Sequence, residues 1–286
     1  MAPLTTIGTD PASSAGWLDN PARMGFFTDT SICIGCKACE VACKEWNHVP
    51  EDGLNFTGMS FDNSVGLGAD TWRHVAFIEQ RKPLGRQESG VGPEPGEANE
   101  LRWLMASDVC KHCTDAGCLD VCPTGALFRT EFGTVVVQED VCNGCGYCVP
   151  ACPYGVIDQR KGDGRVWKCT LCYDRLQAGA EPACAKACPT NSIQFGVLDE
   201  LRERADQRVA QLHANGIADA RLYGHDPQDG VGGTGAFFLL LDEPEVYGLP
   251  PDPVVTTRDL GTMWKRAAMA AVGMAAGVAL SVLGGK

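Results

Sequence analysis

Sixteen cysteines in four quartets constrain this 286-residue chain more than any other feature. The first quartet (Cys33, Cys36, Cys39, Cys43) has the spacing CxxCxxCxxxC, and the third (Cys142, Cys145, Cys148, Cys152) repeats it with Pro153 directly behind. The second (Cys110, Cys113, Cys118, Cys122) has a middle gap of four residues, and the fourth (Cys169, Cys172, Cys184, Cys188) has one of eleven. Every cysteine belongs to a quartet, so the spacing points to a shared use as ligands or redox groups.

This spacing is typical of paired 4Fe-4S clusters, in which three close cysteines hold one cluster and the fourth reaches the other cluster of the pair. Structural zinc is the first alternative, but its cysteines usually come as two separated CxxC pairs, and only the fourth quartet looks like that. Disulfides are the second alternative, and cysteines three apart on tight loops suit them poorly. We therefore expect four 4Fe-4S clusters.

The segments between quartets predict how they pair. ALFRT and TVVVQ, between Cys122 and Cys142, read as a hairpin that returns the chain to its start, so the second and third quartets form one module. By elimination, the first and fourth form the other. The crossing pattern then gives four ligand sets: set 1, Cys33, Cys36, Cys39 and Cys188; set 2, Cys169, Cys172, Cys184 and Cys43; set 3, Cys110, Cys113, Cys118 and Cys152; set 4, Cys142, Cys145, Cys148 and Cys122. Other pairing partners would leave the list of sixteen ligands unchanged.

The chain carries a formal charge of -12, which argues against nucleic acid as a partner because phosphates need a basic face. Four oxidised clusters with thiolate ligands would take this to about -20. Nearby cations would moderate that charge, and Lys168, Lys37 and Lys44 lie beside or within quartets. Lys168 is our candidate for tuning a cluster, and the alternative for each lysine is an ordinary solvated charge.

Residues 267–285 contain no charge and would form about 28 Å of helix, close to one hydrocarbon thickness. We expect a membrane helix that docks on an integral membrane subunit, with Gly273 and Gly277 allowing close approach of another helix; an alanine-rich soluble helix is the alternative. The first twenty residues lack the basic start and apolar run of a secretory signal. Export would therefore depend on a partner with its own signal.

Outside the quartets, residues 51–100 read as a surface insertion, with WRHVAFIEQ as a strand inside it. We interpret His74 as structural, and His112 as a non-ligand because its quartet is already complete. Residues 197–215 have the apolar spacing of a packing helix that Gly216 caps.

The run GVGGTG at residues 230–235 matches a dinucleotide fingerprint, but it precedes the strand AFFLLL, whereas a true fingerprint follows a strand and opens a helix. We therefore do not expect it to bind a nucleotide. A proline-rich connector follows the strand. No nucleophile elbow, phosphate loop or set of substrate-binding residues emerges, so we expect no catalytic site.

The chain resembles the four-cluster ferredoxin-like electron-transfer subunits of molybdenum and tungsten oxidoreductases, and among them the beta subunits of membrane-bound formate dehydrogenases. The resemblance covers nearly the whole chain and is weakest in residues 51–100. It runs through SICIGCKACEVACKEWN, KHCTDAGCLDVCPTGA, CNGCGYCVPACPYG, WKCTLCYDR, EPACAKACPT, and the tail from GVGGTG through EVYGLPPDPVV to the last helix.

The resemblance implies an α+β fold of two ferredoxin-like two-cluster modules with loop insertions, plus one C-terminal transmembrane helix. The expected divisions are an N-terminal arm (1–25), one module (26–50 with 160–200), an insertion (51–105), the other module (106–159), a helix, strand and connector (201–262), and an anchor (263–286).

It also implies the partners: a molybdopterin catalytic alpha subunit, with molybdenum or tungsten, that oxidises formate, and a gamma subunit of cytochrome b or haem-free type that reduces quinone. The soluble bulk would lie on the outer, periplasmic side of the cytoplasmic membrane. Two alternatives stay open: the electron conduit of another reductase, acting on polysulfide or thiosulfate, and a zinc-bearing scaffold.

Overall fold

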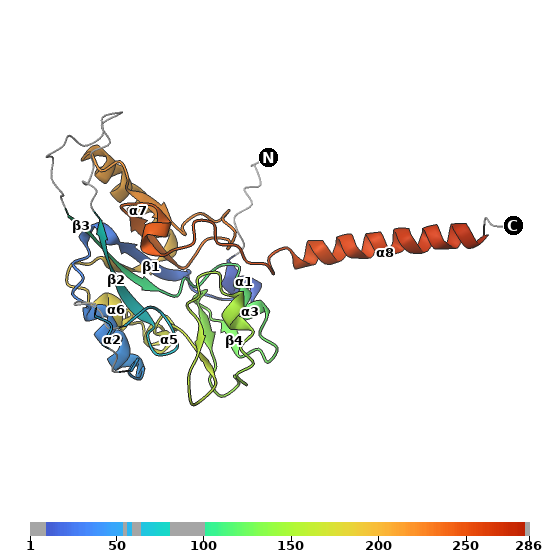
Figure 1. The fold of residues 1–286 in the computed structure, drawn as a ribbon, viewed down its shortest axis with the longest axis horizontal. Helices are drawn as coiled ribbons and strands as arrows, with labels where there is room; N and C mark the ends of the chain where they lie inside the picture. The colour runs from blue at the N-terminus through green and yellow to red at the C-terminus, as the bar shows by residue number, and fades with distance from the viewer. Residues whose placement is uncertain (1–9, 54–55, 59–63, 81–100, 284–286) are drawn as a thin grey trace.

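The computed structural model describes residues 10–53, 56–58, 64–80 and 101–283, and these combine helices with short strands (Figure 1). The helices are α1 (Pro11–Ser14), η1 (Thr30–Ile32), α2 (Ala38–Asn47), α3 (Gly117–Asp120), α4 (Cys148–Ala151), α5 (Tyr173–Gln177), α6 (Ala183–Lys186), α7 (Leu198–Ala214), η2 (Pro244–Tyr247) and α8 (Leu260–Leu283). The strands are β1 (Met24–Asp29), β2 (Arg73–Gln80), β3 (Arg102–Val109), β4 (Leu127–Arg129), β5 (Val135–Val137), β6 (Asp158–Gln159), β7 (Val166–Trp167), β8 (Ile193–Val197), β9 (Arg221–Tyr223) and β10 (Ala236–Leu240).

A four-stranded sheet in the order β8-β1-β10-β9 forms the main core. β1 runs antiparallel to β8 and parallel to β10, which is buried along its whole length. α7 packs on this sheet through Leu198, Leu201, Ala205 and Leu212, the apolar face that the sequence predicts. β1 precedes the first quartet and β8 follows the fourth, so their pairing brings those two quartets together.

The antiparallel pair β2 and β3 packs beside the first quartet, with α2 against β2. β2 is the predicted strand WRHVAFIEQ, and its Val75 faces the core with Leu104 of β3. Residues 81–100, most of the predicted loop, lie outside the described residues. β3 crosses the predicted boundary at residue 105 because it pairs with β2 over its whole length.

Two small hairpins, β4 with β5 and β6 with β7, follow the second and the third quartet respectively. The first of these is the predicted hairpin between Cys122 and Cys142. α3 and α4 pack against each other and share a small apolar core with Leu127, Val135 and Ile157. These elements form the second module, and β7 lies beyond the predicted boundary at residue 159 because it pairs with β6.

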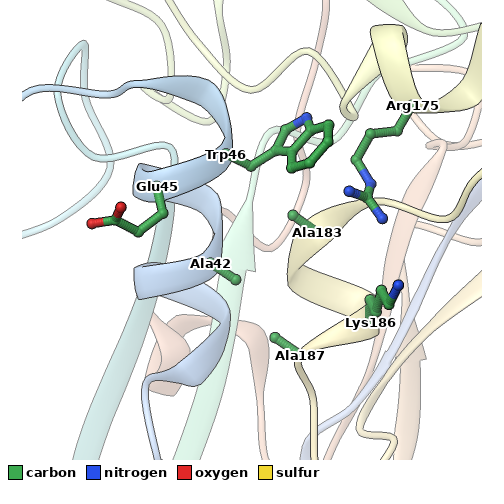
Figure 2. A pocket seen from close by; sticks show the side chains of 7 residues that line it. All are labelled: Ala42, Glu45, Trp46, Arg175, Ala183, Lys186 and Ala187. Atoms are coloured by element: carbon green, nitrogen blue, oxygen red, sulfur yellow. The ribbon is translucent and has the colours of Figure 1, made fainter.

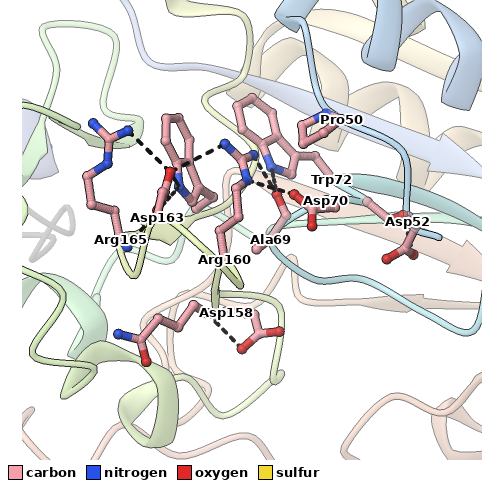
Figure 3. A network of polar contacts seen from close by, with 12 residues as sticks. Pro50, Asp52, Ala69, Asp70, Trp72, Asp158, Arg160, Asp163 and Arg165 are labelled. Carbon is pink, nitrogen blue, oxygen red and sulfur yellow. Dashed lines mark hydrogen bonds and ion pairs between the residues drawn. The ribbon is translucent and has the colours of Figure 1, made fainter.

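Contacts around two stacked tryptophans tie residues 69–72 to the second module (Figure 3). The rings of Trp72 and Trp167 are 6.3 Å apart, and the Arg160 guanidinium lies 4.0 Å from the Trp167 ring centroid. Arg160 Nε also pairs with Asp70 Oδ1 at 2.7 Å. The segment that leads into β2, beside the first quartet, is therefore held against β6 and β7.

α8 projects away from the rest of the molecule (Figure 1). Its 24 residues give a length of about 36 Å, and none of them is buried. Among the described residues it is the one helix long and apolar enough to cross a membrane. It begins three residues before the predicted anchor, at Leu260 rather than Met263.

Candidate metal centres

The fold gathers the cysteines into four groups, which match the four ligand sets. Set 1 lines one small cavity and set 3 lines another. In set 2, Cys43 has Cys169, Cys172 and Cys184 as electrostatic neighbours. In set 4, Cys148 has Cys122, Cys142 and Cys145. The structure thus brings the predicted partners together, and their binding of clusters stays a prediction.

One backbone feature recurs in all four quartets: the residue before the second cysteine has a positive φ. These residues are Gly35, His112, Gly144 and Leu171, with φ of 64°, 45°, 71° and 59°. The left-handed conformation turns the loop sharply, so that the two cysteines of each CxxC step can face the same centre. Glycine takes this conformation without strain, which explains its presence in the two tightest quartets.

The last two cysteines of each quartet are four residues apart at a helix. Cys39 and Cys43 lie on α2, while Cys118, Cys148 and Cys184 lie on α3, α4 and α6, each with its quartet's last cysteine just beyond the helix end. Residues four apart share a helix face. Because the two cysteines belong to different sets, each helix brings two sets close together.

Burial dominates the acid–base properties of these thiols. Burial raises the pKa of Cys39 to about 11 and of Cys118 to about 12, and it raises the pKa of Cys43 and Cys113 well above the ordinary value of a thiol. A buried thiol of this kind is a poor free nucleophile, because the thiolate form is disfavoured. A metal reverses this balance by ionising the thiol that coordinates it.

The arrangement of the cysteine sets can be compared with what a structural zinc site requires. In the described parts of the molecule, no three histidine, cysteine or carboxylate side chains form a group that could hold a single metal ion. Four zinc thiolates would each lie about 2.3 Å from one ion, whereas a four-iron cluster spreads its thiolates over its corners. All sixteen cysteines are described, and none forms a disulfide.

His112 provides a further test of fit at the cavity of set 3, which it lines. Its Nδ1 accepts a hydrogen bond from the Val135 backbone N–H at 3.1 Å, so its proton is on Nε2. Nε2 is buried without a partner among the described residues. A buried donor is costly to leave unpaired, and a bound cluster would supply acceptor sulfur atoms. His112 therefore suits the site as a neighbour of the cluster.

The three lysines that the sequence singles out differ in position. Lys168 is buried and lines the cavity of set 3, where its ammonium donates to the carbonyls of Val135 and Cys169. Lys37 pairs with Glu40 at 3.1 Å, and Lys44 donates to backbone carbonyls. Lys168 alone of the three is a fully buried charge, which suits the tuning role proposed for it.

Sequence reasoning missed Arg73, the largest fully buried side chain. Burial would lower the pKa of this guanidinium, but the negative charge of the neighbouring Cys184 and Cys39, in their thiolate form, raises it above its ordinary value. The signal lay in the strand pattern, since alternation puts Arg73 on the same face as the buried Val75. A cation on the apolar face of a strand needs a buried partner.

The four sets form a linear series, 1-2-3-4. Cys39 of set 1 and Cys184 of set 2 are electrostatic neighbours, as are Cys169 of set 2 and Cys110 of set 3. Cys118 of set 3 has Cys148 of set 4 as a neighbour. Each set is thus an electrostatic neighbour of the next.

Elsewhere the structure agrees with the sequence. GVGGTG forms the loop before β10 and opens no helix. His74 lies 3.3 Å from Ser64 and 4.0 Å from Glu40, in keeping with a structural residue. An open surface hollow lies between α2, α5 and α6, and its lining residues, which include Trp46 and Arg175, form no catalytic constellation (Figure 2).

Two family models for a 4Fe-4S dicluster domain match this chain, over residues 32–126 and 101–198. Together they cover all four quartets and overlap at the second. The matches follow the sequence linearly, whereas the fold pairs the first quartet with the fourth.

Three relatives in Escherichia coli illustrate the similarity. The nitrate-inducible formate dehydrogenase iron-sulfur subunit is 42% identical over 87% of this chain and 79% of its own length. The formate dehydrogenase-O iron-sulfur subunit is 40% identical over 97% and 87%. The B subunit of anaerobic dimethyl sulfoxide reductase is 38% identical over 64% and 77%. With its sixteen grouped cysteines and its two dicluster matches, the chain thus belongs to the family of formate dehydrogenase iron-sulfur subunits.

Proposed function

We propose that this chain relays electrons from formate oxidation, at a molybdopterin catalytic subunit, to a membrane subunit that reduces quinone. Four 4Fe-4S clusters, bound by sets 1 to 4, would form the path. The observation that carries the proposal is the series of four cysteine sets, in which each set is an electrostatic neighbour of the next. Each cluster, when bound, takes up and releases one electron.

The residues around the sets support this role. Small residues and tight loops place each set within one folded unit, and seven of the sixteen cysteines are buried away from water. Fixed surroundings lower the reorganisation that accompanies a change of charge. Buried cations, among them Lys168, offset the negative charge of the bound clusters.

The position of α8 indicates which end of the series of cysteine sets lies nearest the membrane. The connector before it is tied to the loop and helix around Cys118: Thr257 Oγ1 donates to Asp120 at 2.6 Å, and Arg258 Nε pairs with Asp115 at 3.3 Å. The membrane end is therefore the module of sets 3 and 4. Set 1, at the other end of the series, would face the catalytic subunit.

α8 supports an anchor in the cytoplasmic membrane. Its exposed side chains include Trp264, Val272 and Leu280, and so much contiguous apolar surface is unfavourable in water. In our proposal α8 spans the bilayer once beside a gamma subunit of cytochrome b or haem-free type. The soluble bulk lies on the periplasmic side, exported with the catalytic subunit.

The similarity to the B subunit of dimethyl sulfoxide reductase favours one second candidate. The same series of clusters could carry electrons for a different molybdopterin subunit, including one that acts on polysulfide or thiosulfate. The cysteine sets would be used identically, and only the terminal donor and acceptor would differ.

Anaerobic purification of the chain with its bound subunits separates these candidates. We expect a molybdopterin subunit to copurify, and formate to reduce both an artificial dye and a quinone analogue. A complex that is inert to formate but turns over polysulfide or thiosulfate would retain the electron conduit and overturn the formate assignment.

A further inference from the structure

A buried hydrogen-bonded pair, Arg73 and Ser107, lies between sets 1 and 2. Arg73 Nη2 is 3.4 Å from Cys184 Sγ, a member of set 2. Its Nη1 donates to Ser107 Oγ at 3.2 Å and to the Ser107 carbonyl at 3.1 Å. The guanidinium carbon also lies 4.9 Å from the Phe26 ring centroid, so the cation is held on several sides.

Ser107 completes the link to set 1. Its Oγ lies 3.2 Å from Cys39 Sγ. Because this oxygen already accepts from Arg73, its hydroxyl proton is available to Cys39. The contacts thus run from Cys184 through Arg73 and Ser107 to Cys39, and all four residues are buried.

The electrostatic surroundings of Arg73 come from both sets. The charges that act on it belong to Cys184, Cys39, Cys169 and Cys43. Lys168 differs, since its ammonium donates to backbone carbonyls rather than to sulfur. Arg73 is therefore the buried cation in most direct contact with the proposed ligands of sets 1 and 2.

We propose that Arg73 and Ser107 form a bridge that raises the reduction potentials of the clusters in sets 1 and 2 together. This inference rests on the proposed function, because it requires clusters in both sets. Reduction adds an electron to a centre that is already negative, and a buried cation stabilises the added charge. Hydrogen bonds to cluster sulfur atoms act in the same direction.

Arg73 and Ser107 contact different numbers of cysteine sets. Arg73 contacts set 2 directly and set 1 through Ser107, so its removal affects both potentials. Ser107 donates to Cys39 alone, so its removal affects set 1. Within the described residues the hydrogen bonds of the bridge reach no cysteine of sets 3 and 4, which therefore serve as internal references in the same molecule.

The test is a potentiometric titration of the anaerobically purified complex, followed by low-temperature electron spin resonance. Arg73→Gln should lower two of the four midpoint potentials, and Arg73→Lys, which keeps the charge, should lower them less. Ser107→Ala should lower one of the same two. The matched control is Arg102→Gln, a buried arginine that bonds Leu241 O and Asp242 instead of cysteine, and it should move none.

The results of this titration distinguish a failure of the bridge proposal from a failure of the proposed function. Absence of iron and sulfide from the wild-type chain would end the proposed function itself. A full cluster complement with all midpoints unchanged in Arg73→Gln, or equal shifts in Arg73→Gln and Arg73→Lys, would overturn the bridge alone. If Arg73→Gln assembles too few clusters to titrate, Ser107→Ala decides: one lowered midpoint supports the bridge, and none overturns it.

Discussion

At the scale of single residues, the backbone conformation of one residue shapes each quartet. The residue before the second cysteine has a left-handed conformation, which turns the two cysteines toward the same centre. The four quartets reach this conformation with different residues, two glycines, a histidine and a leucine. Gly35 is closely constrained by its neighbours, since an added Cβ would lie 2.7 Å from Phe77 and from Met105. The side chains of β2 and β3 therefore fit closely against the first quartet.

Gly35→Ala tests this packing. Gly155 has the same φ of +64° but open space around its Cα, so Gly155→Ala is a matched control that carries only the backbone strain. We expect Gly35→Ala to be less stable than the control by about 1–3 kcal/mol, the usual cost of overpacking a core. Thermal unfolding followed by circular dichroism measures the difference. Equal melting temperatures for the two variants would show that the contact is not limiting.

Cys145→Ser tests the assignment of one ligand in set 4. Serine is a poor ligand for iron in such clusters, so this variant should lose or convert one cluster and fall from about sixteen irons to about twelve. Formate-to-quinone transfer should fall with it. Tyr147→Phe, an exposed change within the same loop, is the control and should keep the full iron content. An unchanged spin count and turnover in Cys145→Ser would contradict the assignment.

At the scale of elements, local patterns predicted several helices and strands but not the long-range pairing of strands. α7 follows a helical apolar period, and β4, β5 and β10 are short runs of strand-forming apolar residues. The parallel pairing of β1 with β10 joins segments more than 200 residues apart, as Phe26 with Ala236 shows. No local signal specifies such a partner, because it depends on which buried faces meet in the folded chain.

α8 is the element whose role is most open to direct measurement. In cells that lack the gamma subunit, the full chain should remain with carbonate-washed membranes, and a chain truncated from Met263 should be soluble. Val272→Lys should weaken retention, since a lysine at the centre of a spanning helix costs about 2.5–3.5 kcal/mol. Val272→Leu is the control and should be retained. Membrane retention of the truncated chain would refute the anchor role.

At the scale of the whole molecule, the cysteine spacing and the hairpin between Cys122 and Cys142 predicted the four sets, but not their order. The order follows from the helices that carry cysteines of two sets and from the electrostatic proximity of Cys169 and Cys110 between the modules. The attachment of the connector before α8 to Asp115 and Asp120 likewise appears only in the folded chain. In the proposed function, these two features define the membrane end and the catalytic end of the series.

The central claim is that the sixteen cysteines hold four 4Fe-4S clusters. The most direct test measures iron, zinc and acid-labile sulfide in the anaerobically purified chain, together with low-temperature electron spin resonance after reduction. We predict about sixteen irons and sixteen sulfides per chain, with interacting signals from neighbouring reduced clusters. About four zinc ions and no sulfide would contradict the account and make the quartets structural zinc sites.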